Sequence, residues 1–205
     1  MENSVLRNIE PKEVFRYFED LTQIPRESGK ERQVTDYLIA FAENHGLEWL
    51  RDEALNVLIT KKAFPGYEDR PGVILQGHTD MVCEKNENTA HDFDKDPIKL
   101  VLDGDKITAA DTTLGADDGI GIALALALLA DENAKHPFLE VLCTSDEERG
   151  MYGAEAFDTS LLKGRILINL DSNEEDIFTV GCAGGPGVRT EIPIVREEAA
   201  PGWMA

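Results

Sequence analysis

The sequence is poor in basic residues, in cysteine and in aromatic residues, and it has no long apolar run. Lys and Arg together number 20 against 40 Asp and Glu, which leaves a formal net charge of −20. Nucleic acids and anionic membrane surfaces require a basic footprint, so we expect neither as a partner. A chain of this charge is instead suited to binding cations.

Cysteine is scarce, with Cys83, Cys143 and Cys182 far apart in the sequence. Three residues at these spacings give no disulfide framework and are typical of a reducing compartment. The longest apolar stretch, residues 122–130, is too short to cross a bilayer, and the N-terminus lacks the apolar core of a signal peptide. We therefore expect a cytoplasmic protein.

The sequence does contain enough apolar residues, 42% of the chain, to bury a core. Behind Pro11, apolar residues recur at helical spacing, which predicts a helix over residues 11–22. The segment from Ser28 to Glu31 matches a capping box, so a second helix is expected to begin there and to end at Gly46.

Four short apolar runs, rich in β-branched residues and bounded by turn formers, are typical of strands buried on both faces of a sheet. These runs are residues 57–60, 73–76, 139–144 and 166–170. Residues 119–130 are rich in Ala and Leu, which favours a buried helix between the second and third strands. Residues 188–195 alternate in polarity, which predicts one more strand. Strands that alternate with helices predict an α/β layered fold.

The buried-looking segments each run into acidic or histidine residues. These residues are His78 and Asp80, Asp117 and Asp118, Glu147 and Glu148, and Asp171. Because ligands gather beyond the carboxyl ends of the strands in α/β sheets, we expect these side chains to converge. Clustered carboxylates repel one another unless cations neutralise them, so the pattern implies a metal site. Imidazole with carboxylate oxygens suits Zn²⁺, and the excess of carboxylates indicates two ions that share a bridging group.

The spacing of these residues also indicates which chemical role each could have. Asp80 can accept the ring N–H of a metal-bound His78. The adjacent Glu147 and Glu148 point in different directions, so one can bind metal while the other takes a proton from water. A single acidic pair is usually a solvated surface feature, but the repetition at four segments favours a functional site.

The other histidines and cysteines carry weaker signals. Cys83 lies close to Asp80 and could be a soft ligand, although a small buried apolar residue is the better interpretation. His45, His91 and His136 have no ligand spacing to a second His or Cys, and we expect them at the surface.

Four motifs agree in order and spacing with one known family. They are residues 73–82 (VILQGHTDMV), 112–121 (TTLGADDGIG), 145–154 (SDEERGMYGA) and 167–172 (LINLDS). In these motifs the chain resembles the dinuclear zinc metallopeptidases that include aminoacylases, peptidase T and carnosinases. Within that family, residues 24–28 (IPRES), 91–97 (HDFDKDP) and 181–185 (GCAGG) are similar to the bacterial aminoacyl-histidine (Xaa-His) dipeptidases.

The resemblance implies a three-layer αβα catalytic domain with a mixed central sheet that hydrolyses dipeptides, Xaa-His dipeptides in particular. It implies two Zn²⁺ ions per full-length subunit, with Co²⁺ or Mn²⁺ as alternatives. His78 and Asp171 would bind one ion and Glu148 the other, with Asp117 as the bridge. Asp80 would orient His78, and Glu147 would be the general base for attack by a hydroxide that bridges the ions.

The family also has a last zinc-binding histidine and a lid and dimerisation domain, which the resemblance places beyond residue 205. We therefore expect residues 1–181 to be the N-terminal part of the catalytic domain. Residues 182–205 would lead to a missing lid domain, through which the full-length protein forms a homodimer. Such a fragment is expected to have impaired activity. Two alternatives remain open, an amidohydrolase of N-acyl amino acids in the same family and a metal-binding fragment without catalysis.

Overall fold

The computed structural model describes residues 4–6, 8–172, 176–181 and 189–195, in two units. Residues 1–173 form the first unit, which holds the described helices and strands. Residues 174–205 form the second, and its described residues have no regular structure. The predicted strand over residues 188–195 is wrong for residues 189–195, because they pair with no other strand; Val188 lies outside the described residues.

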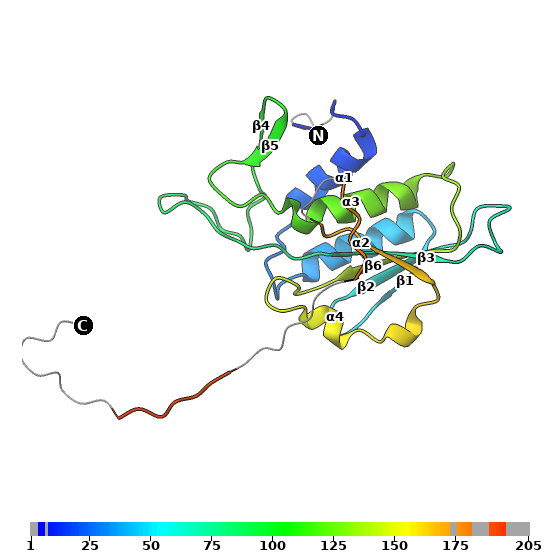
Figure 1. Cartoon of the computed structure of the whole chain (residues 1–205). Helices are drawn as coiled ribbons and strands as arrows, with labels where there is room; N and C mark the ends of the chain where they lie inside the picture. The colour runs from blue at the N-terminus through cyan, green and yellow to red at the C-terminus, as the bar shows by residue number, and fades with distance from the viewer. Residues whose placement is uncertain (1–3, 7, 173–175, 182–188, 196–205) are drawn as a thin grey trace, which may run out of the picture. The chain divides into compact units, whose positions relative to one another are not determined.

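A five-stranded sheet is the centre of the first unit, in the order β1-β2-β6-β3-β7 (Figure 1). The strands are β1 (Glu48–Arg51), β2 (Val57–Lys61), β3 (Val73–His78), β6 (Leu139–Thr144) and β7 (Ile166–Asn169). β2 is antiparallel to β1 and β6, whereas β3 is parallel to β6 and β7. The predicted α/β fold with a mixed central sheet is confirmed.

Helices flank this sheet on both faces. One face is covered by α1 (Lys12–Thr22), α2 (Arg32–Asn44) and α3 (Ala116–Ala130). The short α4 (Tyr152–Ala156) and the 3₁₀ turn η1 (Thr159–Leu161) lie on the other side in Figure 1. The strands serve both layers because successive side chains alternate between faces. Val57 and Ile59 of β2 join the core under α1 to α3, and Leu58 joins a smaller core with Phe157.

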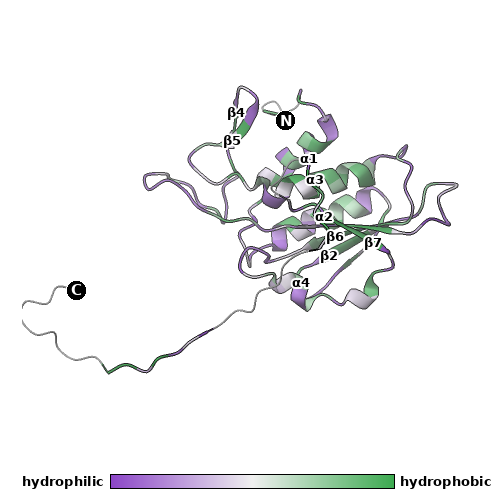
Figure 2. Ribbon diagram, in the orientation of Figure 1, coloured by the Kyte–Doolittle hydropathy of each residue, from purple (hydrophilic) through white to green (hydrophobic). Residues whose placement is uncertain are grey.

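Helix α3 is apolar on nearly all sides, as its Ala- and Leu-rich sequence predicts. Ile122, Leu126 and Leu129 are each at most 2% exposed, and the helix packs against both α1 and β3. Figure 2 shows α3 and the sheet as predominantly hydrophobic. Even so, none of the described helices is long and apolar enough to cross a membrane. The helix therefore belongs to a layered core, with Asp117 and Asp118 at its N-terminal end.

Strand β7 departs from the sequence-based expectation. The run at residues 166–170 forms a strand, but its predicted burial on both faces is wrong. Ile166, Leu167 and Ile168 are 47%, 55% and 43% exposed. These side chains are exposed because β7 is an edge strand. In the part of the chain that the structure describes, it pairs with β3 alone.

Three strands were not predicted from the sequence. They are β1 and the hairpin formed by β4 (Leu100–Asp103) and β5 (Lys106–Ala109). Each has only four residues with few buried side chains, so its apolar pattern is weak. Gly104 in the hairpin turn has a φ of 63°, which a glycine adopts without strain.

We expect Leu126→Ala to lower the free energy of unfolding by about 2–5 kcal/mol, because it leaves a cavity between α3 and its neighbours. Leu126 is 0% exposed, whereas Leu124 on the same helix is 46% exposed. The control Leu124→Ala should therefore change stability by no more than about 0.5 kcal/mol. Urea unfolding followed by circular dichroism measures both, and equal losses would contradict this placement of α3.

Candidate metal centre

The predicted site residues gather where three strands of the sheet end. They are His78 at the end of β3, Asp117 in the first turn of α3, Glu147 and Glu148 after β6, and Asp171 after β7. Because β3, β6 and β7 are parallel, their carboxyl ends meet at one edge of the sheet. The topology thus brings together residues that are up to 93 positions apart in the sequence, from 78 to 171.

These five residues form two overlapping groups of potential ligands. His78, Asp117 and Glu148 make one group, and His78, Glu147 and Asp171 make the other. Within each group the ligand atoms lie within 4.8 Å of one another. His78 Nε2 is 2.9 Å from Asp117 Oδ1 and 4.0 Å from Asp171 Oδ2. A histidine nitrogen with several carboxylate oxygens is a donor set that suits Zn²⁺ and related divalent ions, so these residues fit a metal.

His78 is held by Asp80 so that its free nitrogen faces the carboxylates. Its ring is 1% exposed, and Nδ1 lies 3.1 Å from the Asp80 carbonyl oxygen and 3.4 Å from Asp80 Oδ1. Burial alone would lower the pKa of His78. Hydrogen bonds to Asp80 and Asp117, with the charges of Asp80 and Asp118, outweigh burial and raise the pKa to about 9.

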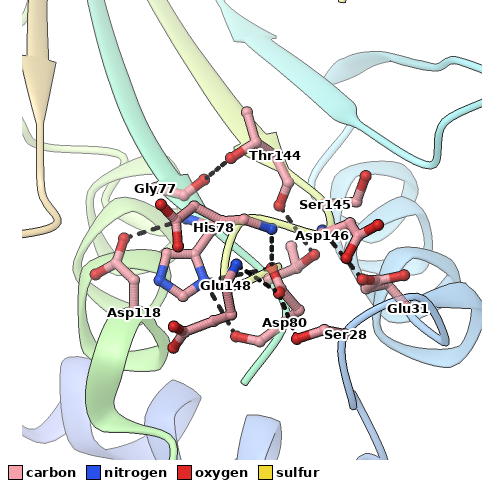
Figure 3. A network of polar contacts seen from close by, with 12 residues as sticks. Ser28, Glu31, Gly77, His78, Asp80, Asp118, Thr144, Ser145, Asp146 and Glu148 are labelled. Atoms are coloured by element: carbon pink, nitrogen blue, oxygen red, sulfur yellow. Dashed lines mark hydrogen bonds and ion pairs between the residues drawn. The ribbon is translucent and has the colours of Figure 1, made fainter. Parts of the chain in front are cut away.

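Asp80 is itself a buried anion that is satisfied by donors (Figure 3). It is 0% exposed and accepts hydrogen bonds from Ser28 Oγ at 2.8 Å, from the Glu147 amide at 3.0 Å and from the Glu148 amide at 3.2 Å. Burial raises the pKa of Asp80, but His78 and these donors outweigh it and lower the pKa to about 2. Asp80 therefore stays ionised over the whole physiological range.

Asp118 contacts the backbone of His78, although the sequence assigned Asp118 no role of its own. It is 2% exposed and accepts a hydrogen bond from the His78 amide at 3.3 Å. Burial, with a smaller contribution from the charges of Asp171 and Asp117, raises the pKa of Asp118 to about 7. Gly77 is required beside it, because a Cβ at that position would collide with the Asp118 carboxylate.

Arg26 is a residue of this region to which the sequence assigned no role. It is 2% exposed; Nη1 donates to the carbonyl oxygens of Thr79 and Asp80, at 3.1 Å each, and Nη2 donates to that of Gly115. Burial lowers its pKa to about 10, so it remains a cation at neutral pH. One side chain thus ties the turn after β3 to the start of α3, and a lone arginine in a loop carries no periodic signal.

The remaining candidates lie outside the two ligand groups. Cys83 is half-buried, and among the described residues no group of potential ligands includes it. The surface position expected for His136 is wrong, since it is 6% exposed. Its Nδ1 lies 2.7 Å from the carbonyl oxygen of Pro137, and its own carbonyl accepts from the Phe64 amide, so local backbone contacts explain its burial.

Two matches to known proteins are strong, and a third, more distant one shows the fold alone. No family model matches the chain. The chain is 44% identical over 200 residues to the cytosol non-specific dipeptidase of Escherichia coli, with 98% of this chain and 41% of that protein covered. The crystal structure of aminoacylhistidine dipeptidase from Vibrio alginolyticus matches with a TM-score of 0.82 and 45% identity, over 85% of this chain and 36% of that one. A tripeptidase from Staphylococcus aureus shares the fold, with a TM-score of 0.68 and 24% identity over 81% of this chain and 44% of that one.

The mixed sheet with flanking helices is thus the α/β fold of a peptidase catalytic domain. More narrowly, the chain is similar over most of its length to the cytosol non-specific dipeptidase and to aminoacylhistidine dipeptidase. It spans 41% of the length of the Escherichia coli relative. The resemblance in the sequence motifs is confirmed at this level, while the role of each site residue stays a prediction.

We expect the metal-free protein, prepared with EDTA, to lose stability as the pH rises toward 9. Asp118, whose pKa is about 7 against an ordinary 3.8, stabilises the fold below pH 3.8 and loses that contribution as the pH rises through 7. His78, at about 9 against an ordinary 6.5, stabilises it below pH 6.5 and loses that contribution as the pH rises through 9. Urea unfolding across this range measures the decline.

A variant separates the contribution of His78 to this loss of stability from that of general charge repulsion in a highly charged chain. His78→Asn should lose the part of the decline that falls between pH 6.5 and 9. His136→Gln, a buried histidine outside the ligand groups, should keep it. The assignment would be wrong if both variants declined as steeply as the wild type over that interval.

Proposed function

We propose that the chain carries most of the dinuclear zinc site of a metal-dependent dipeptidase that hydrolyses Xaa-His dipeptides. The observation that carries this proposal is the pair of ligand groups around His78, each with its ligand atoms within 4.8 Å of one another. The names of the two strong matches support it, since both are dipeptidases. They differ in specificity, one being named non-specific and the other aminoacylhistidine-directed, so the preference for histidine is the finer part of the proposal.

In this proposal His78 and Asp171 would hold one zinc ion, Glu148 would hold the other, and Asp117 would be the ligand that both ions share. His78 Nε2 faces both Asp117 and Asp171, which supports their common role as ligands. Glu148 lies in one ligand group with both His78 and Asp117, so its place at the second ion rests on the sequence resemblance. A histidine from the part of the full-length relatives that this chain does not span completes the set. Co²⁺ or Mn²⁺ are alternatives to Zn²⁺ with the same ligands.

A bound divalent metal polarises the scissile carbonyl and lowers the pKa of water at the site. Glu147 removes a proton from the attacking water as the water oxygen bonds to the carbonyl carbon. Glu147 then delivers that proton to the amine nitrogen as the C–N bond breaks. Burial raises the pKa of Glu147, with Asp171 and Glu148 adding to the effect, and a raised pKa suits a group that both takes and returns a proton. Asp80 orients His78 and holds the Glu147 amide.

The same arrangement serves a related reaction, hydrolysis of N-acyl amino acids, because the scissile bond is again an amide. The names of the relatives favour dipeptides over that alternative, and over a metal-binding fragment without catalysis. We further propose a cytoplasmic location, which the word "cytosol" in the name of the Escherichia coli relative supports. A homodimer formed through a lid domain is proposed for the full-length protein.

The first test is metal content. After equilibration with zinc and dialysis, the chain should retain about one to two ions, because uncompensated carboxylates in this cluster repel one another. Asp117→Ala should lower that number, whereas Asp105→Ala in the exposed β4-β5 turn should not. Elemental analysis of the three proteins decides the matter, and an unchanged metal content in the Asp117 variant excludes this site.

The second test separates the two adjacent glutamates in the full-length enzyme. Glu147→Gln should keep the metal and lower kcat by at least ~100-fold, because a positioned proton carrier is lost. Glu148→Gln should instead weaken metal binding. Zinc content is measured with hydrolysis rates for an Xaa-His dipeptide and an N-acetyl amino acid. Since Glu147 also lies among the potential ligands, loss of zinc in its variant alone would reverse the two assignments.

A further inference from the structure

A second layer of buried carboxylates lies behind the potential metal ligands. Glu31 is 2% exposed and Asp80 is 0% exposed, and oxygen atoms of Glu31, Asp80 and Asp146 lie within 4.8 Å of one another. Carboxylates this close repel one another unless donors or positive charge compensate. Much of the compensation here comes from the backbone of the loop that carries Glu147 and Glu148.

Three consecutive amides of that loop donate to the two buried carboxylates (Figure 3). The Asp146 amide donates to Glu31 Oε1 at 3.0 Å. The next two, at Glu147 and Glu148, donate to Asp80 at 3.0 and 3.2 Å. Asp146 has a φ of 49°, in the left-handed region, and successive amides in such turns form a concave binding site for anions. The anions bound here are side chains of this chain.

Glu31 reaches this loop from a position that looks like a helix cap in the sequence. The predicted capping box is wrong: α2 begins at Arg32, and Ser28 Oγ donates to Asp80 Oδ2 at 2.8 Å. Glu31 Oε1 accepts from the Gly29 amide at 2.6 Å as well as from the Asp146 amide. Both polar side chains of the motif therefore support the site loop instead of the helix end.

A third metal site at Glu31, Asp80 and Asp146 does not explain this cluster. Asp146 forms two bonds with the Arg149 guanidinium, at 2.6 and 2.7 Å. The Asp80 oxygens and Glu31 Oε1 accept the amides just described, so these oxygens already have their donors. These contacts support the loop, and the carboxylates need no cation to compensate their charge.

We propose that Glu31 is a positioning residue of the metal centre. Its carboxylate fixes the backbone at Asp146 and, through it, the directions in which Glu147 and Glu148 point. Glu31 belongs to neither ligand group around His78, so it acts through the loop and not on the metal. The inference rests on the proposed function, because its consequence is expressed at these two glutamates.

The chain offers a matched control in Glu140. This residue is 0% exposed, against 2% for Glu31, and its carboxylate accepts from the backbone amides of Lys163, at 3.0 Å, and of Gly164, at 2.6 Å. Glu140 lies near the start of β6, whereas the metal ligands lie beyond the other end of that strand. Substitution at either position removes the same kind of buried contact, but only Glu31 lies at the site.

The test compares Glu31→Gln and Glu31→Ala with Glu140→Gln and Glu140→Ala in this chain. Glutamine keeps one acceptor oxygen without the charge, so exchange of the amides at 146–148 should rise a few-fold in Glu31→Gln and at least ~10-fold in Glu31→Ala. Zinc affinity, measured by calorimetry, should fall in the same order. Neither Glu140 variant should change these two quantities, even where it lowers the unfolding midpoint as much.

Each outcome decides between the claims. A wild-type chain that binds no zinc overturns the proposed function and this inference with it. If the wild type binds zinc but exchange at 146–148 and zinc affinity are unchanged in the Glu31 variants, the inference alone is wrong. Equal losses of zinc affinity in the Glu31 and Glu140 variants would also overturn it, because general destabilisation would then suffice. Glu31→Gln decides the question if Glu31→Ala does not fold.

Discussion

The carboxylate of Asp80 is the group on which the rest of the site depends. It is fully buried yet ionised, because Ser28, two loop amides and the His78 ring surround it with donors. In return it fixes the ring of His78 on one side and the loop of Glu147 and Glu148 on the other. A buried anion without these donors would be costly, so the fold near the ends of β3 and β6 is built to supply them.

Beyond Asp80, the site is a set of like charges that the protein only partly neutralises. Arg26 contributes a buried cation, but it is directed at carbonyl oxygens and not at the carboxylates of the cluster. Burial, and after it the charges of neighbouring carboxylates, raise the pKa values of Asp118 and Asp171. In the proposed function, binding of a divalent ion would relieve this repulsion, so metal affinity would depend on how the sheet brings the carboxylates together.

Sequence patterns could predict the parts of this structure that depend on periodicity and order. Helices α1 to α3 and strands β2, β3 and β6 follow from apolar spacing, and the gathering of ligands follows from parallel strand ends. Arg26 and Glu31 could not be found in this way, because their partners are backbone atoms far away in the sequence. A local pattern also gave a wrong prediction: the Ser28 to Glu31 motif matches a helix cap, but both side chains form tertiary hydrogen bonds instead. The exposure of β7 likewise depends on what lies beside it and not on its own residues.

Strand β7 has a consequence for the physical behaviour of the chain. Its apolar side chains, with a hydrogen-bonding edge that is unpaired among the described residues, form the kind of template on which a second molecule can add a strand. A net charge of −20 opposes such contacts over a distance of about a Debye length, roughly 10 Å at 0.1 M salt. Colloidal stability of the chain therefore depends on ionic strength, with self-association favoured as salt screens the charge.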